Sequence, residues 1–363
     1  MNILLTCAGR RNYLVQYFAC ALGSGGRVFA ADAAPHAPAL QDAARGFVVP
    51  TVDHPGYTAR LREICRENAI SLLVPLNDLE LPLLAREREC FAEIGTTVLV
   101  STPKVIDTCF DKWATAYFLF RAELPGPKTW RTPAAVRAAL REGELKLPVI
   151  LKPRWGSASI GIEMLDDEED IEPAWRLAVK RLGRSILANA SAADREAPLL
   201  FQERLDGQEY GLDVINDLAG RHLCTFVRRK IGMRAGETDR AAIVRHPALE
   251  ALGERIGRAL GHVGILDCDV FDCGGKLSIL EMNPRFGGGY PFTHEAGANV
   301  PAILIALAQG KVPGPECFAI REGCVAAKCD RLVRMAEVAE AEAKPASPLR
   351  RSNEARRESI AAG

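Results

Sequence analysis

Residues 264–290 read GILDCDVFDCGGKLSILEMNPRFGGGY and combine two apolar strand-like segments with acidic, amide and basic side chains. The segment LDCDVF alternates like a strand, CGGK is typical of a glycine-rich hairpin turn, and LSILEMN predicts the returning strand. Such a hairpin places Asp269 and Glu281 side by side, with Asn283 on the same face as Glu281. The alternative is an edge hairpin with solvated acids and a flexible glycine tail.

Three oxygen ligands on one face suit Mg²⁺, which takes one or two carboxylates and leaves other positions to water and substrate phosphates. We therefore predict that Asp269, Glu281 and Asn283 hold Mg²⁺, with Mn²⁺ as a substitute. Arg285 follows Asn283 by two residues and is expected to place a fixed cation beside the metal.

The composition is that of an ordinary globular protein: 363 residues, 48% hydrophobic and 25% charged, with a formal net charge of +0. A neutral balance gives no reason to expect nucleic acid or a membrane surface as partner. No apolar run approaches a spanning helix, and the start MNILLTCAGRR lacks the character of a signal peptide, so we expect a cytoplasmic protein. The eleven cysteines form no CxxC pair, which favours reduced thiols over disulfides or zinc.

Strand-like and helix-like segments alternate from residue 1 to about residue 103, which predicts a doubly wound parallel sheet. Ligands of such sheets bind beyond the carboxyl ends of the strands. The polar residues expected there are Gly9, Arg10, Arg11, Asp32, Asn77, Asp78 and Glu80. Gly9 and Asp32 invite a dinucleotide interpretation, but only one of the three fingerprint glycines is present, and NAD binding is disfavoured.

The same residues suggest the substrate class. Asp78 and Glu80 would suit an ammonium group, and Arg10 or Arg11 a carboxylate, so amino acids are the first substrates to consider. Arg10 and Arg11 could equally be surface residues at the start of a helix.

Two lysines in the middle of the chain are candidates for phosphate contacts. Lys112 begins an amphipathic helix, and Lys152 ends a buried strand before a loop rich in glycine and serine. Backbone amides and a lysine can together hold phosphates. The loop residues concerned are Gly156, Ser157, Ser159 and Gly161. The GxxxxGK[ST] order is absent, so a P-loop NTPase is not expected, and either lysine could instead be a surface residue.

Other candidates lie on both sides of the central hairpin. Gln202 or Glu203 could bind the amino group of adenine, and Glu209 the ribose hydroxyls. A basic loop with Arg228, Arg229, Lys230 and Arg234 could neutralise a triphosphate or be solvated. His294 could touch substrate or be structural.

The order of these pieces resembles the ATP-grasp superfamily, and more closely its branch similar to the large subunit of carbamoyl-phosphate synthase, over roughly residues 1 to 330. The segments that carry the resemblance are DKWAT with Lys112, VILKPRWGSAS with Lys152, QERLDGQEY, the Asp269 and Glu281 pair, and EMNPRFGGGY. The resemblance implies an N-terminal α/β sheet domain followed by a two-lobed α+β ATP-grasp domain. We expect residues 1–103 on the substrate side, 104–200 as helical linker and phosphate-loop lobe, 201–335 as metal lobe, and 336–363 as a disordered tail.

The resemblance also implies roles for individual residues. Lys112 and Lys152 would contact ATP phosphates under the loop 156–161, Glu209 the ribose, and Arg285 the transferring phosphoryl group or the tetrahedral intermediate. Gln202, Glu203 and Leu205 would line the adenine. Asp269, Glu281 and Asn283 would hold magnesium.

Family enzymes activate a carboxylate as an acyl phosphate and join it to an amine, releasing ADP. The chain has one such module and no visible glutamine amidotransferase segment, so a stand-alone ligase for small-molecule acids and amines is expected. The alternatives are a carboxyphosphate or carbamoyl-phosphate type of phosphotransfer enzyme, or a nucleotide-binding protein without turnover. The chain could form a homodimer.

Overall fold

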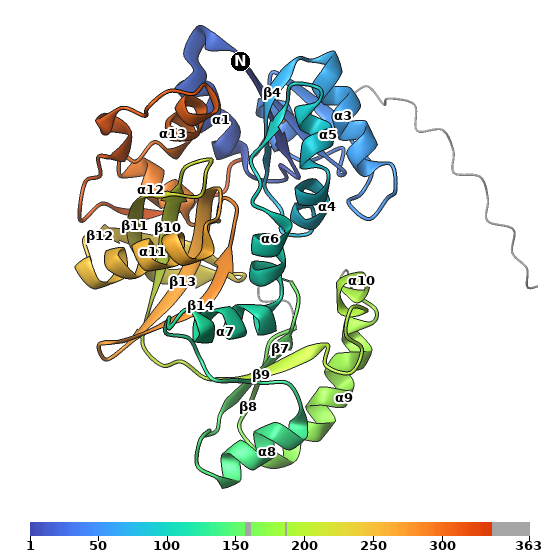
Figure 1. The fold of residues 1–363 in the computed structure, drawn as a ribbon, viewed down its shortest axis with the longest axis vertical. Helices are drawn as coiled ribbons and strands as arrows, with labels where there is room; N and C mark the ends of the chain where they lie inside the picture. Colours follow the sequence, from blue (N-terminus) through green and yellow to red (C-terminus); the bar gives the residue numbers. More distant parts are fainter. Residues whose placement is uncertain (157–160, 186, 336–363) are drawn as a thin grey trace, which may run out of the picture.

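The computed structural model describes residues 1–156, 161–185 and 187–335. Three sheets lie in three parts of the molecule, coloured from blue at the N-terminus through green to orange (Figure 1). The expected tail 336–363 and the loop residues Ser157 and Ser159 lie outside the described residues.

The N-terminal part is a five-stranded parallel sheet in the order β3-β2-β1-β4-β5. Its strands are β1 (Asn2–Thr6), β2 (Arg27–Asp32), β3 (Arg45–Val48), β4 (Ile70–Pro75) and β5 (Thr97–Val98). Its helices are α1 (Asn12–Leu22), α2 (Ala39–Asp42), α3 (Tyr57–Glu67), α4 (Leu81–Arg86) and α5 (Arg88–Ala92). The expected doubly wound sheet is confirmed, and its strand order reverses between β1 and β4.

The part drawn lowest in Figure 1 is a four-stranded antiparallel sheet in the order β6-β9-β7-β8. Its strands are β6 (Thr129–Trp130), β7 (Val149–Pro153), β8 (Glu163–Leu165) and β9 (Leu199–Glu203), with helices α8 (Pro133–Arg141), α9 (Ile171–Leu182) and α10 (Ala188–Ser191). Strand β9 crosses the boundary expected after residue 200, because its pairing with β6 and β7 keeps it in this lobe. Helices α6 (Pro103–Phe110) and α7 (Lys112–Arg121) lead into the lobe.

The third part is a six-stranded antiparallel sheet in the order β14-β13-β10-β11-β12-β15. Its strands are β10 (Gln208–Asn216), β11 (His222–Arg234), β12 (Glu237–Val244), β13 (Gly264–Cys273), β14 (Lys276–Asn283) and β15 (Val325–Ala327). The helices of this part are α11 (Pro247–Leu260), α12 (Tyr290–Glu295) and α13 (Val300–Ala308).

The prediction of a basic loop at residues 228–234 was wrong. These residues continue strand β11, which pairs with β10 on one side and β12 on the other. The chain turns only at Ala235 and Gly236, both of which have positive φ angles. The basic side chains are therefore fixed on a strand.

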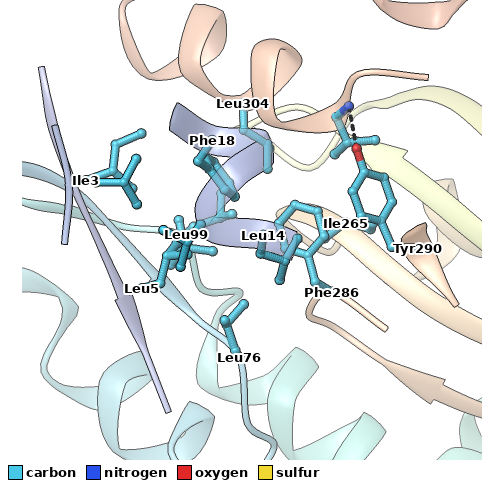
Figure 2. Packing of buried hydrophobic residues seen from close by; sticks show 14 of the residues in the cluster. Ile3, Leu5, Leu14, Phe18, Leu76, Leu99, Ile265, Phe286, Tyr290 and Leu304 are labelled. Atoms are coloured by element: carbon cyan, nitrogen blue, oxygen red, sulfur yellow. Dashed lines mark hydrogen bonds between the residues drawn. The ribbon is translucent and has the colours of Figure 1, made fainter. Parts of the chain in front are cut away.

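One hydrophobic core joins the N-terminal sheet to the six-stranded sheet (Figure 2). Phe286 is fully buried in it and meets Phe18 of α1 and Tyr290 of α12 edge to face, with ring centroids 5.8 and 4.9 Å away. The Tyr290 hydroxyl accepts a hydrogen bond of 3.0 Å from the Val300 amide, which ties α12 to α13. The segment after the central hairpin is thus anchored against α1.

Among the described residues, no helix combines the length and the apolar character needed to cross a membrane. All eleven cysteines are free thiols. Cys109 and Cys268 are buried in the core, whereas Cys324 is half-buried.

Candidate functional site

The central hairpin has the register expected from the sequence. Asp269 on β13 lies directly opposite Glu281 on β14, and the pairing shifts by one residue at the next position, where β14 bulges. Asn283 donates its side-chain amide to Glu281 Oε1 at 3.2 Å, so both side chains lie on one face. Two carboxylates and an amide oxygen therefore converge at this point of the sheet.

A buried lysine accompanies the carboxylates. The Lys230 ammonium lies 2.6 Å from Glu209 Oε1 and 2.7 Å from Asp269 Oδ1. Burial, together with the nearby Asp267 and Glu281, holds the pKa of Asp269 well above its usual range, although Lys230 acts in the opposite direction. Burial alone would lower the pKa of Lys230, but its two carboxylate partners raise it. Lys230 is therefore a permanent cation beside the carboxylate pair.

Arg285 bridges two parts of the molecule. Its guanidinium lies 2.8 Å from Asp78 Oδ2, at the end of the N-terminal sheet, and 3.4 Å from Asp267 Oδ2 on β13. The next residue, Phe286, is fixed in the shared core. The expected cation next to Asn283 is thus held in a defined place.

Behind Arg285, a chain of buried ions continues into the sheet. Arg228 is 1% exposed, lies 2.7 Å from Asp213 Oδ1, and donates to Asp267. Thr293 donates to Asp213 at 2.6 Å. Burying such charges is tolerable only because each one has partners.

The glycine run 287–289 packs directly on these ions. A Cβ at Gly287 would lie 2.1 Å from the Asp267 carboxyl carbon, and a Cβ at Gly289 would lie 2.1 Å from Arg228 Nε. Neither glycine has a positive φ angle, so close approach rather than backbone conformation explains both. The sequence interpretation placed Arg228 in a basic loop and missed its partners Asp213 and Asp267. The glycines next to the acidic hairpin were the signal that could have indicated them.

The two lysines of the middle segment face the same region. Lys152 is 4% exposed and donates to Gln202 Oε1 at 2.6 Å. Burial, and then repulsion from Lys112, lowers the pKa of Lys152 to about 7, although Glu281 acts in the opposite direction. Lys112 donates to the carbonyl oxygen of Gly156. Burial also lowers the pKa of Lys112.

An ion cluster that the sequence did not predict fixes the strand end after Lys152. Arg154 binds Asp111 through two contacts of 2.7 Å and Asp194 through a third of 2.7 Å. Asp111 also accepts from the Trp113 amide and caps α7. The start of α7 and the end of β7 are therefore clamped together, which keeps Lys112 and Lys152 close.

Two cavities meet at the carboxylate pair. The first, of about 370 Å³, lies between the four-stranded lobe and the hairpin; its lining includes Lys112, Lys152, Gly156, Gln202, Glu203, Leu205, Glu209, Asp269 and Glu281. The second, of about 170 Å³, faces the N-terminal sheet; its lining includes Arg11, Asn77, Asp78, Arg228, Lys230, Glu237, Asp269, Glu281, Asn283 and Arg285. Asp269 and Glu281 belong to both linings, as do Met233 and Gly236.

Two family models match the chain on either side of its middle. Residues 3–99 match a PylC-like N-terminal domain. Residues 195–331 match a domain described as ATP-grasp in the biosynthetic pathway with Ter operon. The chain is thus similar to ATP-grasp proteins over the segment that builds the six-stranded sheet.

Curated relatives and solved structures agree with this assignment. The chain is 25% identical over 228 residues to the carbamoyl phosphate synthase large chain of Clostridium botulinum, covering 59% of this chain and 20% of that one. It thus spans about a fifth of the length of this relative.

Two solved structures share the ATP-grasp fold at lower identity. The first is the biotin carboxylase domain dimer of Hydrogenobacter thermophilus 2-oxoglutarate carboxylase in complex with MgADP, ADP and bicarbonate. It superposes with a TM-score of 0.71 at 18% identity, covering 89% of this chain and 73% of that one. The second, the N5-carboxyaminoimidazole synthetase of Staphylococcus aureus complexed with ADP, gives 0.65 at 14% identity, covering 85% and 77%.

The residues around the carboxylate pair fit a divalent cation. No described group of three His, Cys, Asp or Glu side chains is arranged to hold a metal by itself. Asp269 and Glu281 nevertheless lie opposite each other with like charges, and the side chain of Asn283 contacts Glu281 and lines the same cavity. Two carboxylates, an amide oxygen and phosphate oxygens from a nucleotide make the donor set that Mg²⁺ prefers.

Some expected nucleotide contacts are engaged within the protein. The Gln202 side chain accepts from Lys152 and donates to Thr129 Oγ1 at 3.0 Å, so both of its polar atoms have partners within the protein. Glu203 accepts from the Lys128 amide at 2.7 Å while lining the cavity. Leu205 lines the same cavity, and Gly161 follows the part of the loop that is not described.

On the N-terminal side, Glu80 needs a correction. Its side chain is 0% exposed and accepts hydrogen bonds from the Tyr57 hydroxyl and the Leu76 and Asn77 amides. It therefore stabilises the turn after β4 and has no free face for a substrate ammonium. Asp78 does line the second cavity, but it holds Arg285.

Three further substrate candidates lie away from both cavities. Arg10 is 82% exposed and pairs with Asp330, and Arg234 pairs with Asp239 and Asp330. His294 stacks on Tyr17 with ring centroids 3.6 Å apart and is hydrogen-bonded to Tyr290, which is a structural arrangement. Turn geometry and core packing direct these three side chains away from the cavities, and neither can be derived from the sequence in such detail.

Two further polar residues of the N-terminal sheet, Asp32 and Asn77, differ in their surroundings. The Asp32 carboxylate accepts hydrogen bonds from the Gly9 and Ala34 amides, both at 2.8 Å. It therefore stabilises the turn after β1 and is not free for a ribose contact. Asn77 lines the second cavity.

Proposed function

We propose that this chain is an ATP-dependent ligase that activates a carboxylate as an acyl phosphate and joins it to an amine, with ADP as the nucleotide product. One observation supports this proposal above the others: both carboxylates of the pair, Asp269 and Glu281, line both cavities. A nucleotide in the first cavity and an acid in the second would meet at the same carboxylate pair, where phosphoryl transfer needs its charges neutralised.

In the first cavity, the phosphate end is defined by the lysines. The buried Lys152 and the half-buried Lys112 both belong to the lining, as does Gly156, where the glycine-rich loop begins. Glu203 and Leu205 line the same cavity and would contact the base, and Glu209 would contact the ribose. This order directs the γ-phosphate toward Asp269 and Glu281.

The chain acts on the reaction by alignment and charge. Asp269, Glu281 and Asn283 would hold Mg²⁺, or Mn²⁺ in its place. The bound metal ion would neutralise negative charge on the phosphates of the nucleotide. Arg285 and Lys230 place two fixed cations on the acid side of the same carboxylates. They hold the reacting carboxylate and stabilise negative charge that develops as its oxygen attacks the γ-phosphorus.

The chemistry then needs two bonds to form in sequence. A carboxylate oxygen bonds to the γ-phosphorus and ADP leaves. The amine nitrogen bonds to the acyl carbon, inorganic phosphate leaves with the carbon–oxygen bond pair, and the amine loses a proton. No protein nucleophile takes part, so the described residues supply position and electrostatic stabilisation only.

Amino acids are the first substrates to test, because the second cavity is lined by charges of both signs. The test is an acid panel with ATP and Mg²⁺, in which the nucleotide product is identified and hydroxylamine is added to trap an acyl phosphate as a hydroxamate. ADP together with hydroxamate supports the ligase. ADP with a stable phosphorylated product supports a phosphotransfer enzyme, nucleotide binding without turnover supports a binding protein, and AMP would overturn the proposal.

A further inference from the structure

The second cavity lies at the reversal point of the N-terminal sheet. Its N-terminal wall consists of Arg11, which follows β1, and of Asn77 and Asp78, which follow β4. Strands β1 and β4 are neighbours, and the helices that follow them, α1 and α4, pack in different hydrophobic cores. Crevices of this kind are where open α/β sheets bind ligands.

The cations of this cavity differ in one respect. Arg228, Lys230 and Arg285 each have two carboxylate partners within 4.0 Å. Arg11 has none within that distance among the described residues, although it lines the same space; its charge does reach Glu237 of the same lining, whose pKa Lys328 and Arg11 lower against the effect of burial. It is therefore a cation whose charge the described protein does not neutralise by a close ion pair.

The backbone of Arg11 is held in place. It is the residue that precedes α1; its amide donates to the Ala8 carbonyl at 2.9 Å, and its carbonyl accepts from the Leu14 amide at 2.9 Å. Helix α1 packs in the core shared with α13, with Leu14 and Phe18 fully buried. The guanidinium thus extends from a rigid base, which lowers the cost of binding an anion.

Arg10 provides an internal contrast. It has the same charge one residue earlier, but it is exposed, pairs with Asp330 and is not part of the cavity lining. The two arginines therefore separate the effect of a cation in the cavity from the effect of positive charge on this loop.

We propose that the acid bound in this cavity carries a second negatively charged group, received by Arg11, while its reacting carboxylate lies beside Arg285 and Lys230. The substrate class is a small dicarboxylic acid, including the α-amino dicarboxylic acids. A cavity of about 170 Å³ lined mainly by charged and amide groups suits a compact, polar molecule of this kind. This inference rests on the proposed function, which assigns the reacting carboxylate to the metal side.

The direct test is calorimetric binding with MgADP present. The probes are succinate, glutarate, L-aspartate and L-glutamate, compared with butanoate and pentanoate of equal chain length. A charge-assisted contact to Arg11 should make the dicarboxylates bind about ten- to a hundredfold more tightly. Arg11→Gln should abolish that difference, Arg11→Lys should restore part of it, and Arg10→Gln should leave it unchanged. Melting temperatures verify that each variant is folded.

The outcomes separate this inference from the proposed function. Equal binding of mono- and dicarboxylates, no binding of any dicarboxylate, or an Arg11→Gln variant that binds like the wild type would overturn the role of Arg11. Hydroxamate formation from monocarboxylates in the same variant would then leave the ligase standing. Conversely, Arg11-dependent binding without ADP or hydroxamate from any probe would keep the anion site and remove the ligase.

Discussion

Nucleotide binding should be coupled to proton uptake through Lys152. The pKa of this lysine is about 7 in the free protein, mainly because the side chain is buried and secondly because Lys112 lies nearby. Phosphate oxygens beside the ammonium would favour its charged form and raise the pKa again. Binding therefore draws a proton from solvent at any pH where the free lysine is partly neutral.

The sign and the size follow from this shift. Because the pKa is lower in the free protein than in the complex, affinity is full below about pH 7 and falls as the pH rises above that value. At about pH 8, roughly nine-tenths of the free molecules carry a neutral lysine, so the apparent affinity is about tenfold weaker than at pH 6, or ~1.4 kcal/mol.

Titration calorimetry with ADP measures both quantities. Experiments at about pH 6 and pH 8, in buffers with different ionisation enthalpies, give the number of protons taken up and the change in affinity. Lys152→Arg keeps the positive charge but does not titrate, so its uptake should fall by nearly one proton at about pH 8. Lys146→Arg, at an exposed position, is the matched control.

The comparison between proteins removes the ionisation of ADP itself, which is common to all of them. Equal proton uptake and equal pH slopes in the wild type and Lys152→Arg would refute the reasoning. Lys152 would then either stay charged in the free protein or lie away from the phosphates.

Two further changes test the metal face and the glycine run. Glu281→Gln should lower ADP release by roughly 10²-fold or more while the melting temperature is kept, because the change removes a ligand charge and also the repulsion with Asp269; Glu322→Gln at the surface should alter neither, and an active Glu281→Gln would remove the hairpin from the site. Gly287→Ala and Gly289→Ala should each reduce the free energy of unfolding by about 1–3 kcal/mol in denaturant titrations. Gly288→Ala, whose Cβ would stay 3.3 Å from the nearest atom, should cost much less, and equal losses at all three positions would contradict the packing argument.

The hairpin and the N-terminal sheet could be predicted because their signals are local. Alternating residues on both sides of Gly274 and Gly275 determine which side chains share a face, and the short turn determines the register that pairs Asp269 with Glu281. Lys152 at the end of a buried strand is a signal of the same kind.

The partners of the charged residues could not be predicted, because they come from distant strands. Nothing in the segment around Arg228 shows that β10 and β13 will place Asp213 and Asp267 against it. Which of Arg10 and Arg11 lines the second cavity depends on the geometry of the turn before α1, where a shift of one residue would exchange them. Glu80 looked free because its partners, the Tyr57 hydroxyl and two backbone amides, arise only when the turn after β4 is folded.

The distribution of cores indicates which parts of the site are fixed relative to one another. The N-terminal sheet and the six-stranded sheet share one core, and the Arg285–Asp78 ion pair crosses the same boundary. The four-stranded lobe has a core of its own, against which Leu79 from the turn after β4 packs. Lys112 and Asp111 also contact the residues that follow β7. The second cavity is therefore preorganised, because moving its walls apart would break the Arg285–Asp78 ion pair and the shared hydrophobic core together. Opening that admits a nucleotide is expected at the joint of the four-stranded lobe, where Lys152 would move with β7 while Asp269 and Glu281 stay in place.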